Sequence, residues 1–399
     1  MDRRRFLEKA ATVSAAYALP LTVSRGLFAA GMPADLVDLD AIGLSIAIKD
    51  KHTSCVEVMQ AYLQHIHTYN PAYNAIISMV DDDELIDQAR EADQALARGD
   101  YRGWMHGMPH AVKDLLPVAG LRHTDGSPMY ANRIAENDSA LVARLRGEGA
   151  IFIGKTNTPE FGLGSQSYNP VFGATGSAWN PELTSGGSSG GAASGLGTHM
   201  LPVADGSDMM GSLRNPGAFN NVIGFRPSVS VMSNNPTGPR ALSTSGPMGR
   251  NTADTIRLLQ TIAVQPVASD YSPMSLNNVK LGWMGNLDDY LAMEPGILNL
   301  CESSLSSISS AGATVEATRP GFTMSDLWFC WTTLRHSGRA SMKSFYDNPE
   351  TRAQLKPEVI WEIEQSQILT DSDRSNANLI RASWYSELER MFSQYDFLV

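Results

Sequence analysis

Two serines and one lysine lie in segments whose composition suits nucleophilic chemistry. Ser188 is flanked by glycines in the run 185–191, Ser212 closes the run 205–212, and Lys113 stands between Ala111-Val112 and Leu115-Leu116-Pro117. A serine hydroxyl is a weak nucleophile until a base removes its proton. A lysine can be that base only when it is neutral, and burial among apolar groups favours the neutral form. These residue types therefore suit a Ser–Lys variant of the serine nucleophile.

Each of these residues also has a structural interpretation. Lys113 can be a surface lysine paired with its neighbour Asp114. Ser188 can be the N-cap of the helix expected over 190–197, although Ser189 is equally placed to cap it. The flanking glycines remove side-chain clashes and let the backbone approach a ligand closely.

Other catalytic motifs fit the sequence less well. Residues 186–190 satisfy G-x-S-x-G, but that motif must follow a strand, and residues 180–184 are turn-prone. No phosphate-binding G-x-x-x-x-G-K-[ST] and no HExxH occurs. His65 and His67 are expected on different sides of a helix, which favours surface histidines over a metal site.

Three segments together resemble the amidase signature family: 107–114, 185–191 and 205–216. The spacing of 24 residues between Ser188 and Ser212 (212 minus 188) is similar to that between this family's relay serine and nucleophile. The resemblance runs from about Leu36 to the last residue. It implies that Ser212 is the nucleophile, that Ser188 follows a cis peptide bond and relays protons, and that Lys113 is the base. Further pieces that resemble the family are 154–161, 180–181, 224–228 and 245–248.

The resemblance also implies roles around the nucleophile. Backbone N–H groups of Met209, Met210, Gly211 and Ser212 would form the oxyanion hole. Supporting roles fall to Ser189, Asp208 and Arg214. The alternative for the Asp208–Arg214 pair is an ordinary surface ion pair, worth roughly 0–1 kcal/mol.

Two features depart from the family pattern. Met210 stands where the family usually has glycine, so a positive φ there would strain it; a side chain in the acyl pocket is the other outcome. Residues 395–399 read as the start of a buried strand, beyond which the family generally continues. The domain over 36–399 is therefore expected to be shortened at its C-terminal end.

Helix and strand signals alternate along the chain. Ser54 and Glu57 form a capping-box pattern, with Pro71 closing that helix. Further helices are expected over 83–98, 140–146, 190–197, 252–264 and 294–310, and strands over 75–80, 150–153, 201–204, 222–225 and 280–283. The alternation predicts an α/β fold, a three-layer α/β/α domain around a central mixed, twisted sheet.

The N-terminus differs from the rest. Three arginines at 3–5 precede Phe6-Leu7 and an uncharged run over 10–23, an order similar to a twin-arginine export signal. Residues 1–30 are therefore interpreted as a signal segment, which predicts a periplasmic or secreted protein. The alternative is a basic helix on a cytoplasmic protein. The run is too short for a comfortable membrane span.

Composition limits the partners. The net charge of −11 gives a nucleic-acid partner no electrostatic support. Cys55, Cys301 and Cys330 are far apart, which favours buried free thiols over disulfides or a thiolate metal site. No metal or organic cofactor is implied.

The predicted activity is hydrolysis of a small carboxylic amide to carboxylate and ammonia or amine, through an acyl-Ser212 intermediate. Two rivals stay open: an amidotransferase A-type subunit that amidates charged transfer RNA, and a catalytically impaired binding protein, suggested by Met210 and the short C-terminus. Four aromatic residues could line an acyl site, although core positions are favoured for each: Tyr168, Phe172, Trp328 and Trp331.

Overall fold

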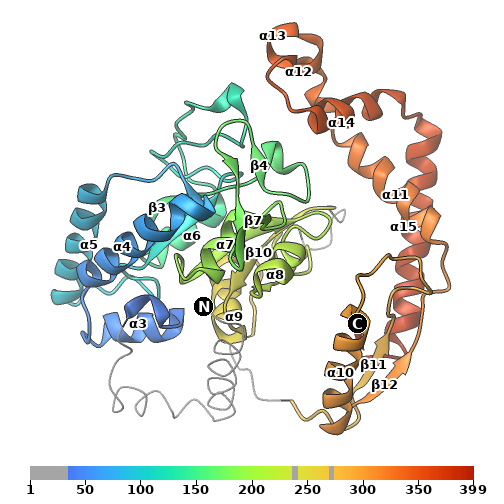
Figure 1. The fold of residues 1–399 in the computed structure, drawn as a ribbon, viewed down its shortest axis with the longest axis horizontal. Helices are drawn as coiled ribbons and strands as arrows, with labels where there is room; N and C mark the ends of the chain where they lie inside the picture. Colours follow the sequence, from blue (N-terminus) through green and yellow to red (C-terminus); the bar gives the residue numbers. More distant parts are fainter. Residues whose placement is uncertain (1–34, 236–240, 269–273) are drawn as a thin grey trace. The chain divides into compact units, whose positions relative to one another are not determined.

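The computed structural model describes residues 35–399 except 236–240 and 269–273. They form two compact units (Figure 1). Unit 1 comprises residues 35–126 and 130–265, and unit 2 comprises residues 127–129 and 266–399. The range 36–399, expected as one domain, is thus divided between two units. The predicted signal segment, 1–30, lies outside the described residues.

The helices of unit 1 form where the sequence has capping residues and apolar residues at helical spacing. The capping box of Ser54 and Glu57 is present and opens α4, but Pro71 lies inside this helix instead of closing it, and Asn74 ends it in the left-handed conformation. The helices of the unit are η3 (Leu36–Asp38), α3 (Ala41–Lys49), α4 (Cys55–Tyr73), α5 (Asp82–Ala97), α6 (Ala140–Gly147), η5 (Glu160–Gly162), α7 (Gly190–Gly197), α8 (Arg214–Asn220) and α9 (Thr252–Ile262).

The strands of unit 1 form small mixed and antiparallel sheets. They are β1 (Ile76–Ile77), β2 (Pro109–Lys113), β3 (Ile151–Thr156), β4 (Tyr168–Asn169), β5 (Gly173–Ala174), β6 (Gly176–Ser177), β7 (Asn180–Thr184), β8 (Val203–Asp208), β9 (Ile223–Gly224) and β10 (Thr244–Gly249). One sheet has the order β1-β3-β2, with β3 antiparallel to β1 and parallel to β2. A second has the antiparallel order β8-β10-β9. The predicted α/β class with mixed strands is confirmed.

The core of unit 1 brings β2 and β8 together. The two strands lie beside each other, and α7 packs against both. All five residues of β2 are buried, and β8 is buried except for Ser207. Gly191 at the start of α7 is required by this packing, because a Cβ atom there would lie 2.3 Å from the backbone nitrogen of Asn157. The glycine-rich segment is therefore a packed element of the core and not a linker.

Unit 2 is largely helical. Its elements are η4 (Pro128–Tyr130, of which Tyr130 is in unit 1), β11 (Lys280–Trp283), α10 (Ile297–Ser310), β12 (Thr314–Ala317), α11 (Met324–Ser337), η6 (Ala340–Met342), α12 (Lys343–Asp347), α13 (Pro349–Arg352), α14 (Pro357–Ile368), α15 (Asp371–Phe392) and β13 (Phe397–Leu398). The parallel strands have the order β12-β11-β13, and α11 packs along α15 (Figure 1).

Some burial expectations are wrong. The strand expected over 222–225 forms only at Ile223–Gly224, and the neighbouring Phe225 is exposed instead of buried. The C-terminal strand forms as expected, but Phe397 is exposed because β13 is the edge strand of its sheet. Tyr168 and Trp328 are also exposed and are not core residues.

Helix length, hydropathy and side-chain grouping bear on whether the described residues span a membrane or bind a metal. Within the described part of the chain, no helix has both the length and the apolar character needed to cross a bilayer. Over the same residues, no cluster of three or more His, Cys, Asp or Glu side chains could hold a metal ion. The three cysteines are free thiols, and Cys55 and Cys330 are buried.

Candidate active site

Lys113 is the last residue of β2, and its side chain is buried. The residue is 1% exposed because the strand pairs with β3 on one side and lies beside β8 on the other. Its amine nitrogen, Nζ, lies 2.8 Å from Ser188 Oγ, 2.8 Å from Ser189 Oγ and 3.1 Å from Ser207 Oγ. The base and the relay serine predicted from the sequence are therefore in direct contact.

The surface-lysine interpretation of Lys113 is wrong. The neighbouring Asp114 is also buried, but its carboxylate accepts hydrogen bonds from the backbone and hydroxyl of Thr124. Its cationic partner is a different lysine, Lys155 of β3, with Nζ 3.7 Å from Asp114 Oδ1. Lys113 has no carboxylate partner at salt-bridge distance among the described residues, and its amine faces hydroxyl groups.

Burial changes the proton affinity of Lys113. Loss of solvent around the side chain lowers the pKa of Lys113 from 10.5 to about 7, while the carboxylates of Asp205 and Asp208 oppose this shift. A base works best when its pKa is near the operating pH. Near neutral pH a large fraction of Lys113 is thus in the neutral form that can accept a proton.

Ser188 lies in the turn that precedes α7. The Gly187–Ser188 peptide bond is cis, as the family resemblance implies. Ser188 is buried, and the N–H of Gly187 donates to Asn215 Oδ1 at 3.0 Å. The N-cap residue of α7 is Ser189, but its side chain makes no capping hydrogen bond because its hydroxyl faces Lys113 instead.

Ser212 lies in the connection from β8 to α8 and is partly exposed. Its carbonyl oxygen accepts a hydrogen bond from the N–H of Ser189 at 3.2 Å, which places its backbone beside the relay segment. The hydroxyl of Ser212 makes no hydrogen bond to a described residue. The structure thus joins Lys113 to Ser188 through side chains, and Ser212 to the same turn through the backbone.

The loop before Ser212 is held by a buried carboxylate. Asp208 accepts hydrogen bonds from the N–H of Gly211 at 2.8 Å and of Leu213 at 3.2 Å. Arg214 donates to both of its oxygens, from Nε at 3.0 Å and from Nη2 at 3.1 Å. Arg226 adds a third ion-pair contact at 2.9 Å. Burial would raise the pKa of Asp208, but the hydrogen bonds from Arg214 and the backbone outweigh it and hold the pKa at about 2.

The predicted oxyanion donors differ in their engagement. The N–H of Gly211 is directed to Asp208, whereas those of Met210 and Ser212 have no acceptor among the described residues. Gly211 has φ +103 and is the one residue of 209–212 with a positive φ. Met210 is therefore free of the backbone strain that its place in the family pattern suggested, and its side chain is 49% exposed.

Sequence reasoning missed two members of this site. Ser207 completes the hydroxyl shell of Lys113, and Arg226 pairs with Asp208. The strand alternation of 203–208 could have pointed to Ser207, since it lies on the opposite side of β8 from Asp208. A sequence signal for Arg226 existed only as part of the family-like piece 224–228.

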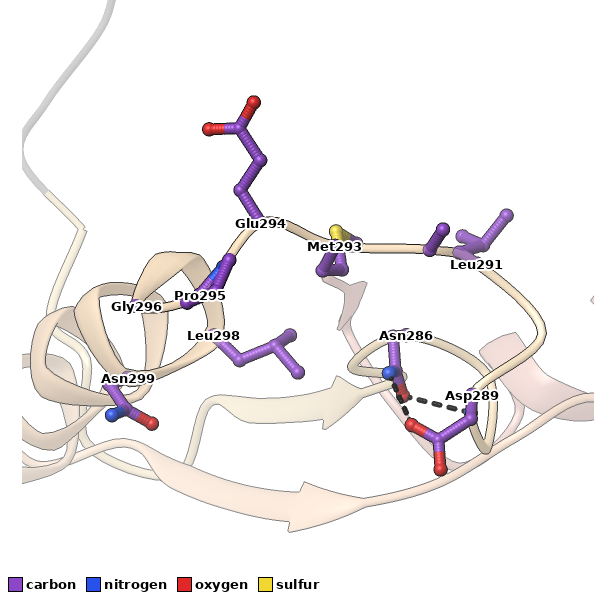
Figure 2. A pocket seen from close by; sticks show the side chains of 10 residues that line it. Asn286, Asp289, Leu291, Met293, Glu294, Pro295, Gly296, Leu298 and Asn299 are labelled. Carbon is purple, nitrogen blue, oxygen red and sulfur yellow. Dashed lines mark hydrogen bonds between the residues drawn. The ribbon is translucent and has the colours of Figure 1, made fainter.

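A separate pocket lies in unit 2. Figure 2 shows it between the turn of Asn286 and Asp289 and the first turn of α10, with Pro295 and Gly296 just before that helix and Leu298 in it. None of the predicted site residues lines it. The predicted site residues all lie in unit 1.

Comparison with known proteins gives concordant matches. The Amidase family profile matches residues 57–399. An acylamidase of Rhodococcus erythropolis is 30% identical over 376 residues, which are 90% of this chain and 78% of the relative. The A-type subunit of the glutamyl-tRNA(Gln) amidotransferase of Thermosynechococcus vestitus is 34% identical over 286 residues, but the match covers 68% of this chain and only 59% of that protein.

Solved structures share the fold. A bacterial aryl acylamidase of the amidase signature enzymes superposes with a TM-score of 0.80 at 24% identity, covering 90% of this chain and 78% of that chain. The family profile spans most of the sequence, and the acylamidase match extends over nearly all of it. The chain therefore belongs to the amidase signature family and is a hydrolase acting on amide C–N bonds.

Proposed function

We propose that this enzyme hydrolyses a small carboxylic amide through an acyl-Ser212 intermediate, with Ser188 as proton relay and Lys113 as base. The observation that carries the proposal is the contact of the buried Lys113 amine with Ser188 Oγ at 2.8 Å. A buried amine next to hydroxyls, without a paired carboxylate, is the arrangement that a neutral lysine base requires.

The hydrogen bonds around Lys113 favour Ser188 as the relay. A neutral amine donates two hydrogens and accepts one through its lone pair. The hydroxyl of Ser189 already donates to the carbonyl of Ser207 at 3.3 Å, so toward Lys113 it acts as an acceptor. The hydroxyls of Ser188 and Ser207 remain as possible donors to the lone pair of the Lys113 amine. Of these two residues, only Ser188 adjoins Ser189, whose N–H donates to the carbonyl oxygen of Ser212.

The reaction follows from these positions. Ser188 accepts the proton of the Ser212 hydroxyl and passes its own to Lys113, while Ser212 Oγ bonds to the carbonyl carbon and the carbonyl electron pair moves to oxygen. On collapse, the C–N bond breaks, Ser188 protonates the leaving nitrogen, and Lys113 returns its proton to Ser188. A water molecule then attacks the acyl-enzyme by the same proton route and releases carboxylate and Ser212.

The backbone N–H groups of Met210 and Ser212 are proposed to stabilise the oxyanion. Within the predicted set 209–212, the N–H of Gly211 already donates to Asp208. The N–H groups of Met210 and Ser212 have no acceptor among the described residues and can therefore bind the substrate oxygen. Loss of one such donor typically costs about 10²–10³ in rate. Asp208, held by Arg214 and Arg226, keeps this loop in place.

The test is labelling with a fluorophosphonate probe together with hydrolysis of aliphatic, aryl and peptide amides. Ser212→Ala is expected to lose both, and Lys113→Met, which fills the buried site without a charge, is expected to lose roughly 10⁴-fold or more in turnover while staying folded. Ser194→Ala is the matched control, because Ser194 is a buried serine of α7 whose hydroxyl donates to the carbonyl of Gly176. Labelling that persists in Ser212→Ala would refute the assignment.

Two alternatives are separated by the same experiment. A wild-type chain that neither labels nor hydrolyses any amide would be the impaired binding protein. An amidotransferase subunit would co-purify with partner subunits and transfer ammonia to charged transfer RNA. The acylamidase match, which covers the larger share of both chains, supports the hydrolase.

We further propose that the chain is exported. The support is the order of residues 3–23, in which three arginines precede Phe6-Leu7 and an uncharged run. Twin-arginine export carries folded proteins.

A further inference from the structure

A buried histidine and a buried aspartate lie next to the backbone of Lys113. His110 of β2 and Asp205 of β8 are both 0% exposed, and His110 Nε2 lies 3.1 Å from Asp205 Oδ1. The other carboxylate oxygen, Oδ2, accepts the backbone N–H of Lys113 at 3.3 Å. One carboxylate thus holds both a neighbouring ring and the main chain of the proposed base.

This pair bridges two strands that share no ladder hydrogen bonds. β2 pairs with β3, and β8 pairs with β10, so the Asp205 side chain supplies the acceptor that the N–H of Lys113 would otherwise lack. The His110 ring packs edge-on against Phe152, at a centroid distance of 6.2 Å, and its Nδ1 has no partner among the described residues. The ring therefore has one polar contact, and that contact orients Asp205.

A fully buried carboxylate is costly unless it is compensated. The charged or titratable groups around it are His110 and Lys113 on β2, Asp114 at the end of β2, Lys155 on β3 and Asp208 on β8. Asp205 also acts to raise the pKa of Lys155, but that amine is already paired with Asp114. The amine for which the charge of Asp205 matters most is therefore that of Lys113, which has no carboxylate partner at salt-bridge distance among the described residues.

We propose that Asp205, oriented by His110, is a positioning residue for Lys113: it fixes the backbone from which the base extends, and its negative charge keeps the desolvated amine basic enough to take a proton from Ser188. This inference rests on the proposed role of Lys113. It explains why the strand next to the base carries a buried carboxylate whose side chain makes no contact with the reacting hydroxyls.

A negative charge stabilises the protonated amine, so its removal lowers the pKa of Lys113 below about 7. The protonated base is the inactive form. Asp205→Asn, which keeps the shape and an acceptor, should therefore move the acidic limb of kcat/KM to lower pH, by roughly 0.5–1 pH unit. The weaker base should also lower the kcat plateau, roughly two- to threefold for a Brønsted slope near one half, with KM unchanged.

The experiment measures kcat and kcat/KM from pH 5 to 9 on the full chain, with thermal unfolding of each variant. Asp254→Asn is the matched control, since Asp254 is also fully buried but lies in α9 and accepts hydrogen bonds from the start of α3, and its profile should follow that of wild type. An Asp205→Asn profile that coincides with wild type would overturn the inference. The proposed function fails separately, if Lys113→Met retains activity.

A second pair of variants decides the matter if Asp205→Asn does not fold. His110→Gln keeps an N–H donor near the position of Nε2, whereas His110→Phe keeps the ring volume and removes the donor. The expected result is a fall in kcat for His110→Phe, largely restored in His110→Gln. Equal and wild-type-like kcat values for both variants would contradict the positioning role.

Discussion

At the residue scale, two buried lysines show how partners decide chemistry. Lys113 and Lys155 are both almost fully buried, and burial lowers the pKa of each. Lys155 has a carboxylate partner, Asp114, and donates to the carbonyl of Leu116. Lys113 faces three hydroxyls instead. The carboxylate of Asp114 favours the charged form of Lys155, whereas Lys113 has no carboxylate at salt-bridge distance among the described residues and is the better suited of the two to act as a base.

The first prediction concerns pH. The proposed function makes the neutral amine of Lys113 the active form, and its pKa is about 7, so kcat/KM should fall as the pH drops below 7, approaching tenfold per pH unit. Asp208 adds nothing in this range, since its pKa of about 2 leaves it ionised throughout. A pH profile measured with an uncharged amide is the check. A profile that stays flat down to pH 5 would show that another group, or no lysine, is the base.

At the element scale, the site forms where the C-terminal ends of two strands lie next to the N-terminal end of a helix. β2 ends at Lys113, β8 carries Ser207 next to its end, and α7 begins at the turn of Ser188 and Ser189. The helix expected over 190–197 is α7, with the same bounds. Its small glycine and alanine side chains let it pack closely on the strands. The strand expected over 201–204 is β8, which the structure places at Val203–Asp208. Its C-terminal half is polar, so the apolar pattern did not predict that the strand continues to Asp208 inside the core.

A helix of unit 1 is anchored by one distant carboxylate. Asp254 of α9 accepts the N–H groups of Ala41 at 2.9 Å and of Ile42 at 3.0 Å, the first two residues of α3. Arg250 donates to the carbonyl oxygens of Val37 and Leu39 just before that helix. Residues 36–49 are thus held to the rest of unit 1 by side chains that lie more than 200 residues away.

The second prediction follows from this anchor. Asp254→Ala leaves two N–H groups at the start of α3 without an acceptor, so the free energy of unfolding should fall by roughly 1–3 kcal/mol. Denaturant unfolding measures the change. Glu91→Ala is the control, because Glu91 is exposed on α5, and its effect should stay within about 0.5 kcal/mol. Equal stabilities of the two variants would show that the anchor contributes nothing.

At the scale of the whole molecule, the described residues include a large hydrophobic core in unit 1 and a much smaller buried cluster in unit 2. The core of unit 1 extends in sequence from Val37 to Ile262 and surrounds β2, β8 and α7. A small cluster in unit 2 comprises Val279, Leu281, Leu305 and Ala313. Lys113, Ser188 and Ser212 all belong to unit 1, so the proposed catalytic groups are carried by the unit with the larger core.

The third prediction is made for the whole protein in its cell. If residues 1–30 act as a twin-arginine signal, the chain should be found outside the cytoplasm, and Arg3→Lys combined with Arg4→Lys should retain it inside, because the export system reads the arginine pair of Arg-Arg-x-Phe-Leu. Cell fractionation followed by serine-probe labelling measures both location and folding. Export unchanged by the double substitution would favour a different route.

The sequence by itself determined the residue types, the spacing of the two serines, and the glycines that α7 needs to pack. These are local properties, or properties of motifs long enough to reveal the family. Only the tertiary structure decided that Ser207 contacts the amine of Lys113, that Asp114 pairs with Lys155, and that Asp205 binds both His110 and the backbone of Lys113. Those contacts join residues as many as 95 positions apart, and their chemistry depends on how completely folding removes water from each group.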